Sequence, residues 1–263
     1  MSLTDAELER YSRQLVMPEW SGRAQERLRS ASATVIGAGA LGSPAATYLA
    51  AAGVGRIGIV DEDEVELSNL HRQPLHLSPD VGARKAENAA VKLGFLNPEV
   101  VVEPFPARLE EMNAEALLTG ADVVVDCSDS FATRYLVNDT CCELGLPLVE
   151  GGLLALSGLV MSIRPGESAC YRCAFPVEPR AGAVPSCREA GVLGAVGGML
   201  GSLQALEAIK LLTGVGEPLL DRLLQFDGST SAPTVTATRR REDCPACGHV
   251  APPQSAGTAE APA

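Results

Sequence analysis

The sequence predicts an α/β fold, a Rossmann-like, doubly wound and mostly parallel sheet that carries a C-terminal extension. Short apolar runs typical of buried strands alternate with longer helical patterns from about residue 31 to residue 150, and a glycine-rich turn follows the first of these runs. After residue 151 the alternation gives way to further strand-like runs around one long apolar helix. We therefore expect the second half of the chain to extend the same sheet.

The N-terminal residues 1–30 are expected to form a helical segment ahead of the sheet. Thr4 and Glu7 have the spacing of a capping box, which predicts a short helix that reaches about Tyr11. A second helix is expected over residues 23–30.

The main domain is expected to occupy residues 31–250, and it begins with a strand–turn–helix–strand unit. Residues 34–36 have the pattern of a buried strand, and the glycine turn covers residues 37–42. A helix over 43–52 then leads to a strand over 56–60. This order of elements is the start of a parallel sheet.

The remaining elements follow from the same patterns. Alternating helices and strands are expected over residues 83–93, 100–104, 110–118, 122–125, 131–144 and 147–149. The extension is expected to place strands at 159–163, 223–226 and 235–238, with a long helix at 192–212. The tail over 251–263 has little apolar surface to bury and is expected to be disordered.

Composition and charge limit the classes of function. Hydrophobic residues make up 46% and charged residues 21% of the chain, which excludes collagen-like, coiled-coil and wholly disordered proteins. A formal net charge of −12 disfavours non-specific binding to nucleic acid or to an anionic membrane. The N-terminus lacks the pattern of a secretory signal, and the apolar window 191–203 is too short to span a membrane. We therefore expect a buried core helix there and a cytoplasmic protein.

Three glycines of the turn have the spacing of a nucleotide-binding motif. Gly37, Gly39 and Gly42 allow a tight turn, a close approach of the backbone to a phosphate, and close helix packing. Asp61 ends the second expected strand, where its carboxylate can accept hydrogen bonds from ribose hydroxyls. The pattern predicts an adenine nucleotide without distinguishing NAD from ATP. The alternative is a turn kept only for packing.

Further polar residues are expected at the same edge of the sheet. Arg72 follows the second strand and Lys85 lies near the start of the next helix, so both can neutralise a triphosphate. The alternative is that they are solvated surface cations. Asp126 and Asp129 follow the next strand and can together hold Mg²⁺, unless Asp129 or Ser130 only caps the following helix.

Four of the eight cysteines form two CxxC pairs. They are Cys170, Cys173, Cys244 and Cys247. In a reducing compartment four thiolates favour a closed tetrahedral zinc site, which would join the end of the chain to its body. The alternatives are a redox dithiol or a packing role for one of the pairs.

The other cysteines have different surroundings. Cys187 precedes Arg188 in a loop-like segment ahead of the long helix, so it is either a reactive nucleophile or an ordinary free thiol. Cys127, Cys141 and Cys142 lie in apolar-patterned stretches and are expected in the core.

Taken together, these motifs resemble the MoeB/ThiF family, the bacterial relatives of ubiquitin-activating enzymes. The resemblance runs from about Glu9 to Gly248. It is carried by Tyr11-Ser12-Arg13-Gln14, Gly37 to Gly42, Asp61, Ser68-Asn69-Leu70-His71-Arg72-Gln73, Lys85, Asp126 to Asp129, the CxxC pairs and Cys187 to Gly191. Their order and spacing together are highly specific.

The resemblance implies an activity and a set of partners. It implies an ATP-dependent adenylyltransferase that acts on the C-terminal glycine of a small ubiquitin-like sulfur carrier ending in Gly-Gly. The adenylated carrier would go on to thiocarboxylate formation in molybdopterin, thiamine, tRNA thiolation or a related pathway. Since no sulfurtransferase segment follows Cys247, a separate sulfur donor is expected. Neither nucleic acid nor membrane is expected as a partner.

The resemblance also assigns roles to individual residues. ATP would be bound by Gly39, Asp61, Asn69, Arg72 and Lys85. Asp129 would hold Mg²⁺, the CxxC pairs would hold structural zinc, and Arg13 would reach the phosphates of the partner protomer in a homodimer. Cys187 matches a cysteine that some members use for covalent linkage to the carrier. Ser130 departs from the asparagine often found there, with little consequence for helix capping.

The expected mechanism follows from charge. The carrier carboxylate is already ionised, attacks the α-phosphate without a strong base and releases pyrophosphate, while Arg13, Arg72, Lys85 and Mg²⁺ stabilise the phosphate charge. An NAD-dependent oxidoreductase is the alternative, but it explains only the glycine turn and Asp61. A zinc-stabilised scaffold without catalysis leaves the full set of ATP-site residues unexplained.

Overall fold

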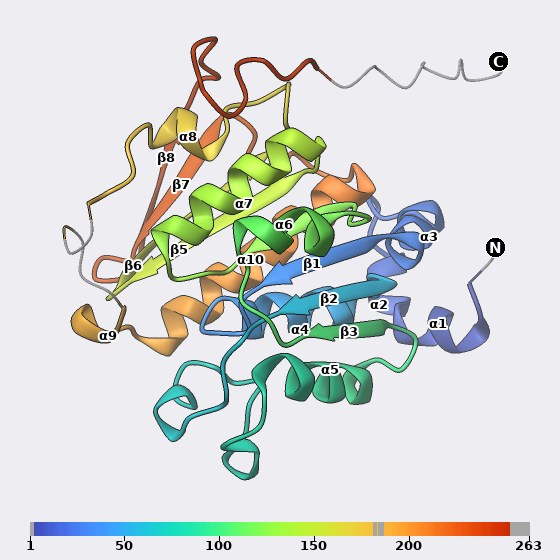
Figure 1. Ribbon diagram of the computed structural model, residues 1–263. Helices are drawn as coiled ribbons and strands as arrows, with labels where there is room; N and C mark the ends of the chain where they lie inside the picture. The colour runs from blue at the N-terminus through green and yellow to red at the C-terminus, as the bar shows by residue number, and fades with distance from the viewer. Residues whose placement is uncertain (1–2, 181–182, 184–186, 253–263) are drawn as a thin grey trace, which may run out of the picture.

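One eight-stranded sheet organises the described chain (Figure 1). The computed structural model describes residues 3–180, 183 and 187–252, without the side chains of Cys187 and Arg188. In spatial order the strands are β3 (Val101–Phe105), β2 (Arg56–Val60), β1 (Ser32–Ile36), β4 (Val123–Asp126), β5 (Leu148–Leu154), β6 (Ser157–Ile163), β7 (Arg222–Asp227) and β8 (Ala232–Ala237). The first five pair in parallel, and β6 to β8 are added antiparallel. This confirms the predicted α/β fold with an extension on the same sheet.

Helices cover both faces of this sheet, and each face has its own hydrophobic core. One face is covered by α3 (Gly22–Ser30), α4 (Gly42–Ala52), α5 (Lys85–Leu96) and α10 (Gly194–Thr213). The other is covered by α6 (Glu111–Leu118) and α7 (Phe131–Leu144), which lie in front of the sheet in Figure 1.

Short helices occur at the ends of the sheet. They are α1 (Asp5–Arg10), α2 (Ser12–Leu15), α8 (Tyr171–Ala174), α9 (Cys187–Ala190) and the 3₁₀ turns η1 (Leu67–Asn69) and η2 (Ser78–Asp80). The capping box at the start of α1 is formed as predicted, with Glu7 N–H donating to Thr4 Oγ1 at 3.2 Å. The other short helices were not predicted, because a single turn of helix leaves no periodic pattern in the sequence.

Strand β5 differs most from its prediction. It was expected to end at residue 149 but continues to Leu154. Its first part pairs with β4, whereas the part after Glu150 pairs, among the described strands, with β6 alone. Gly151 and Gly152 therefore stay in the sheet, although their low strand propensity suggested an end.

Helix α10 is the one described helix that is long and apolar enough to cross a membrane by length and composition. Its Gln204 and Glu207 are fully buried and bind groups of the sheet and of the loop that follows α10. These contacts confirm the predicted core helix, which lies behind the sheet in Figure 1.

Candidate functional site

A cavity of about 610 Å³ lies at the carboxyl ends of β1, β2 and β4. This is the edge at which open α/β sheets bind their ligands. Its walls include most of the predicted nucleotide-site residues, namely Gly37, Gly39, Asp61, Asn69, Arg72, Lys85 and Asp129. Residues from four separate stretches of the sequence thus meet in one place.

The three glycines of the turn have three different surroundings. Gly37 has φ +90°, a conformation that favours glycine. A Cβ atom on Gly42 would collide with the carbonyl oxygen of Gly37, so Gly42 allows α4 to pack against the turn. At Gly39 the nearest atom to an added Cβ would be Gln73 Nε2 at 3.7 Å, so the backbone there is open to the cavity.

The backbone of Ala38, inside this turn, is hydrogen-bonded through both its N–H group and its carbonyl oxygen. Its N–H donates to Asp61 Oδ2 at 2.7 Å, and its carbonyl oxygen accepts from Ser43 Oγ at 3.1 Å. His76 Nε2 lies 3.2 Å from the same carbonyl oxygen, so we assign the ring proton to Nε2. Burial lowers the pKa of His76, which keeps the ring neutral. His76 was not predicted as part of the site, because nothing in its local pattern marks it.

Asp61 and Lys85 form the charged wall of the cavity. Burial raises the pKa of Asp61, and the nearby Lys85 ammonium opposes this effect. Lys85 is only 5% exposed, and its Nζ lies 2.8 Å from Asp63 Oδ2. The alternative that Lys85 is a solvated surface cation is therefore wrong.

Arg72 and Asn69 lie on the segment that follows β2. Arg72 is half-buried and its Nη1 donates to Ser68 O at 2.7 Å. The side chain of Asn69 is buried, and its Oδ1 accepts from Glu66 N–H at 3.0 Å. Asn69 therefore shapes the loop that presents Arg72 to the cavity.

The two aspartates after β4 have different positions. Asp126 is fully buried, and its Oδ1 accepts from Ser128 N–H at 2.8 Å, so the expectation that both carboxylates hold a metal is wrong for Asp126. Asp129 is exposed and lines the cavity. Ser130, rather than Asp129, caps α7, because its hydroxyl accepts from Thr133 N–H at 3.4 Å. The Asp129 carboxylate is thus not used as the helix cap.

A buried charged cluster lies beside this edge of the cavity. Asp126 at the end of β4 and Glu150 inside β5 are register partners, and Arg134 Nε lies 3.7 Å from Glu150 Oε1. Burial raises the pKa of both carboxyl groups, and the negative charge of Asp126 adds to the effect at Glu150. Arg134 also lines the cavity, a cation that was not predicted from the sequence.

Arg13 lies near the amino ends of the parallel strands, opposite the cavity. It is exposed on α2, whose neighbour Gln14 bonds Ala52 O at the last turn of α4. The glycine turn is at the other end of α4, about 16 Å away along an 11-residue helix. The structure therefore does not bring Arg13 into the cavity of its own chain.

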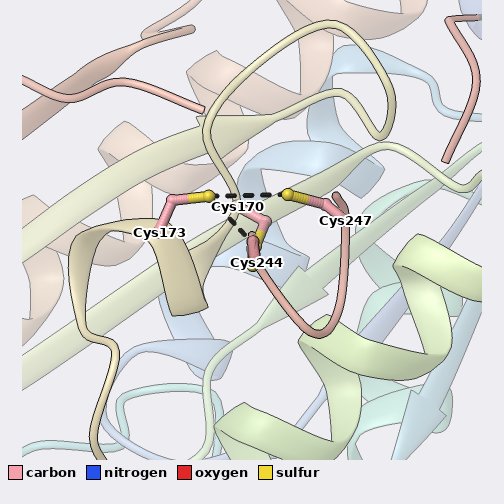
Figure 2. Close-up of side chains that lie close together, drawn as sticks. All are labelled: Cys170, Cys173, Cys244 and Cys247. Carbon is pink, nitrogen blue, oxygen red and sulfur yellow. Dashed lines mark hydrogen bonds between the residues drawn. The ribbon is translucent and has the colours of Figure 1, made fainter. Parts of the chain in front are cut away.

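The four cysteines of the CxxC pairs converge as predicted (Figure 2). All four Sγ atoms lie within 4.8 Å of one another. Neighbouring sulfurs are 3.4 Å apart for Cys173 and Cys247 and 3.6 Å apart for Cys170 and Cys244. Sulfurs bound to one tetrahedral zinc at about 2.3 Å are about 3.8 Å apart, so the cluster fits such an ion.

An arginine holds the second CxxC pair in place. Arg240 Nη1 donates to Gly166 O at 2.9 Å, and Nη2 donates to Cys247 O at 2.6 Å. This side chain therefore ties the turn after Cys244 to the body of the protein.

The remaining thiols differ in what the structure describes. Cys127, Cys141 and Cys142 are buried, as expected for core residues. The side chain of Cys187 lies outside the described residues, so its predicted reactivity stays a prediction.

The sequence and the fold were compared with known proteins. The profile of the ThiF family matches residues 11–246. The sulfur carrier protein adenylyltransferase of Thermus thermophilus is 48% identical, over 94% of this chain and 93% of the relative. The SAMP-activating enzyme E1 of Haloferax volcanii is 47% identical, over 94% of this chain and 92% of the relative. A crystal structure of E. coli MccB with succinimide has a TM-score of 0.82 at 24% identity, covers 91% of this chain and 74% of its own, and supports the fold alone.

Proposed function

The chain belongs to the ThiF family, and on this premise we propose that it adenylylates the C-terminal glycine carboxylate of a small ubiquitin-like sulfur carrier with ATP. The observation that carries the proposal is the meeting of Gly39, Asp61, Lys85 and Asp129 around one cavity. An NAD-dependent oxidoreductase needs the glycine turn and Asp61 but has no use for a buried lysine and a free carboxylate beside them.

Four residues of the cavity have roles in this reaction. The open backbone at Gly39 admits the phosphates, and Asp61 Oδ1 accepts from the ribose hydroxyls while Oδ2 keeps the turn in shape. The carrier carboxylate attacks the α-phosphorus, the bond to the bridging oxygen breaks, and pyrophosphate leaves. Lys85 and Arg72 stabilise the negative charge of the phosphate oxygens. The products are the acyl-adenylate and pyrophosphate.

Mg²⁺ and Zn²⁺ are part of the proposal. Mg²⁺ commonly takes one or two carboxylates together with substrate phosphates, and Asp129 is an exposed carboxylate at the cavity. Bound there, Mg²⁺ would neutralise charge on the phosphates. Zinc on the four cysteines would be structural, since a closed Cys₄ set leaves no open position for substrate.

We also propose a homodimer in which Arg13 completes the site of the partner protomer. The outer surfaces of α4 and α10 expose Tyr48, Met199 and Leu206, an apolar face on two adjacent helices. Both helices run from the carboxyl ends of the parallel strands, where the cavity lies, to the amino ends, near Arg13. A twofold packing of this face, with the helices antiparallel, therefore brings the Arg13 edge of one protomer to the cavity edge of the other.

Three finer points remain proposals. A separate protein supplies the sulfur to the adenylated carrier. Cys187 serves only a later covalent step, because adenylation uses no protein nucleophile. The expected location is cytoplasmic.

The experiment is carrier-dependent exchange of pyrophosphate into ATP. Candidate carriers are small proteins ending in Gly-Gly that co-purify with the enzyme from its host. We expect exchange only with ATP, Mg²⁺ and a carrier that keeps its C-terminal glycine. A nicotinamide absorbance change without pyrophosphate exchange would instead support the oxidoreductase.

A further inference from the structure

Two consecutive glycines of β5 admit side chains from both faces of the sheet. A Cβ atom on Gly151 would collide with the amide of Gln204, which comes from α10 on one face. A Cβ atom on Gly152 would collide with Arg134, which comes from α7 on the other face. Since consecutive strand residues point to opposite faces, Gly151 and Gly152 let both side chains reach the carboxyl end of β4.

Gln204 is fully buried and uses both atoms of its amide. Nε2 donates to Asp126 O at 2.6 Å, and Oε1 lies 3.5 Å from Cys127 Sγ. Burial raises the pKa of the Cys127 thiol well above its ordinary value, and the neighbouring carboxyl groups of Asp126 and Glu150 add to this effect. The thiol is therefore protonated and donates to Oε1, so the amide is satisfied in one orientation.

Arg134 holds the same segment from the opposite face. Its Nη2 donates to Ser128 O at 2.9 Å. The carbonyl oxygens of Asp126 and Ser128, on either side of Cys127, are thus bound from the two faces of the sheet. Asp129, whose carboxylate lines the cavity, is the next residue.

We propose that Gln204 is a positioning residue for Asp129. Gln204 sets the backbone at the end of β4, and this backbone determines where the Asp129 carboxylate meets Mg²⁺ and the phosphates. This inference rests on the proposed function for the role of Asp129, but the hold on residues 126–128 is a property of the protein alone.

The same helix also supports the phosphate-binding turn. Cβ atoms on Gly197 and Gly201 of α10 would press on the carbonyl oxygens of Ala40 and Leu41. One rigid helix therefore carries the turn on its glycine face and the Asp129 segment through Gln204. We infer that α10 keeps these two parts of the site at a constant separation.

Two variants and one control separate positioning from a general effect on the fold. Gln204→Met keeps the volume of the side chain and removes its hydrogen bonds. Gly151→Ala leaves Gln204 present but displaces its amide group. The control is Glu207→Gln. Glu207 is also fully buried on α10, but it binds Ser162 and Leu219, which do not line the cavity.

Three quantities are measured on the full-length proteins. They are the melting temperature, hydrogen–deuterium exchange of the peptide over 126–130 without ligand, and the Mg²⁺ concentration for half-maximal ATP binding. We expect faster exchange at 126–130 in Gln204→Met and Gly151→Ala. We also expect them to require about three- to tenfold more Mg²⁺, the scale of one lost hydrogen bond. Glu207→Gln changes the melting temperature alone.

Two results would overturn the inference. One is unchanged exchange at 126–130 in both site variants, and the other is an equal rise in the Mg²⁺ requirement in the Glu207→Gln control. Failure of the proposed function has a different signature, in which the wild-type protein does not bind ATP or binds it independently of Mg²⁺. Hydrogen exchange then still decides whether Gln204 holds the segment.

Discussion

At the scale of single residues, burial decides which charged groups can act on a substrate. Asp126 and Asp129 are three positions apart, yet one is sealed in the core and the other faces the cavity. Lys85 is also buried, but its ammonium group lies beside Asp63 and lines the cavity. The roles of these residues follow from where their atoms lie, more than from their residue types.

The first prediction concerns Asp129. Asp129→Asn should lower Mg²⁺-dependent pyrophosphate exchange at least about 100-fold, the scale for one lost electrostatic contact in a transition state. The exposed side chain is not the cap of α7, so the free energy of unfolding should change by less than about 0.5 kcal/mol. Exchange and urea unfolding are measured on the same sample. Wild-type exchange in this variant would contradict the assignment.

The second prediction concerns the pH dependence of stability. Burial raises the pKa of Glu150 well above its ordinary value, so the folded protein holds this proton more tightly than the unfolded chain does. Its contribution to stability is complete below about pH 4.3 and is lost as the pH rises through the raised pKa. Gln at this position does not titrate.

The unfolding free energy of the wild type minus that of Glu150→Gln should therefore fall as the pH rises above the ordinary glutamate pKa of about 4.3 and towards the raised pKa of the folded state. Urea titrations at several pH values measure this difference. A difference that grows with pH would show that the carboxyl group is stabilised in its ionised form instead.

At the scale of elements, the ends of helices and strands determine the site. The glycine turn joins β1 to α4, the segment after β4 carries Asp129, and η1 leads to Arg72. Helix α10 supports the first two of these parts from one face. The cysteine cluster connects two other segments, because it joins the turn after β8 to the start of α8.

The third prediction concerns this cluster. We expect one zinc per chain in freshly purified protein, and none in Cys244→Ser. Removal of zinc should loosen the segments around Cys170 and Cys244 without unfolding β1 to β5. Zinc-finger peptides gain an apparent free energy of about 10–16 kcal/mol from metal binding. Here the parallel sheet has its own hydrophobic core, so only part of this free energy should contribute to folding.

Elemental analysis and hydrogen exchange measure these effects. Cys141→Ala is the matched control, because Cys141 is a buried thiol outside the cluster and its loss should leave the zinc in place. Metal-free wild-type protein would refute the zinc assignment.

At the scale of the whole molecule, the fold of one chain keeps Arg13 apart from the cavity that its proposed role requires it to reach. Arg13 lies at the amino edge of the sheet and the cavity lies at the carboxyl edge. The exposed apolar face of α4 and α10 runs between these two edges. A twofold dimer through this face joins them, so assembly and activity are coupled in this proposal.

The fourth prediction tests this coupling. Arg13→Ala and Asp129→Ala proteins, each inactive alone, should regain activity when mixed and allowed to exchange subunits. Half of the dimers in an equal mixture are mixed and each has one intact site, so recovery should reach roughly a quarter of the wild-type rate. Tyr48→Asp in both proteins should prevent the recovery by disrupting the apolar face. No recovery despite proven subunit exchange would place Arg13 outside the partner's site.

The sequence alone was sufficient for what depends on neighbouring residues. The capping box of Thr4, the order of strands and helices, and the different tasks of Gly37 and Gly42 were all predictable, because each depends on local spacing. The convergence of the two CxxC pairs was also predictable, because four cysteines in two such pairs are typical of a structural metal site.

Only the tertiary structure decided what depends on distances between remote segments. It separated Asp126 from Asp129, buried Lys85, and placed Arg13 at the far edge of the sheet. It also brought Gln204 to the end of β4, 78 residues earlier in the chain. The strand was expected to end before Gly151 and Gly152, and only the structure showed that the side chains of Gln204 and Arg134 approach these glycines. Burial and contact arise when distant elements pack together, and no local pattern records which elements will meet.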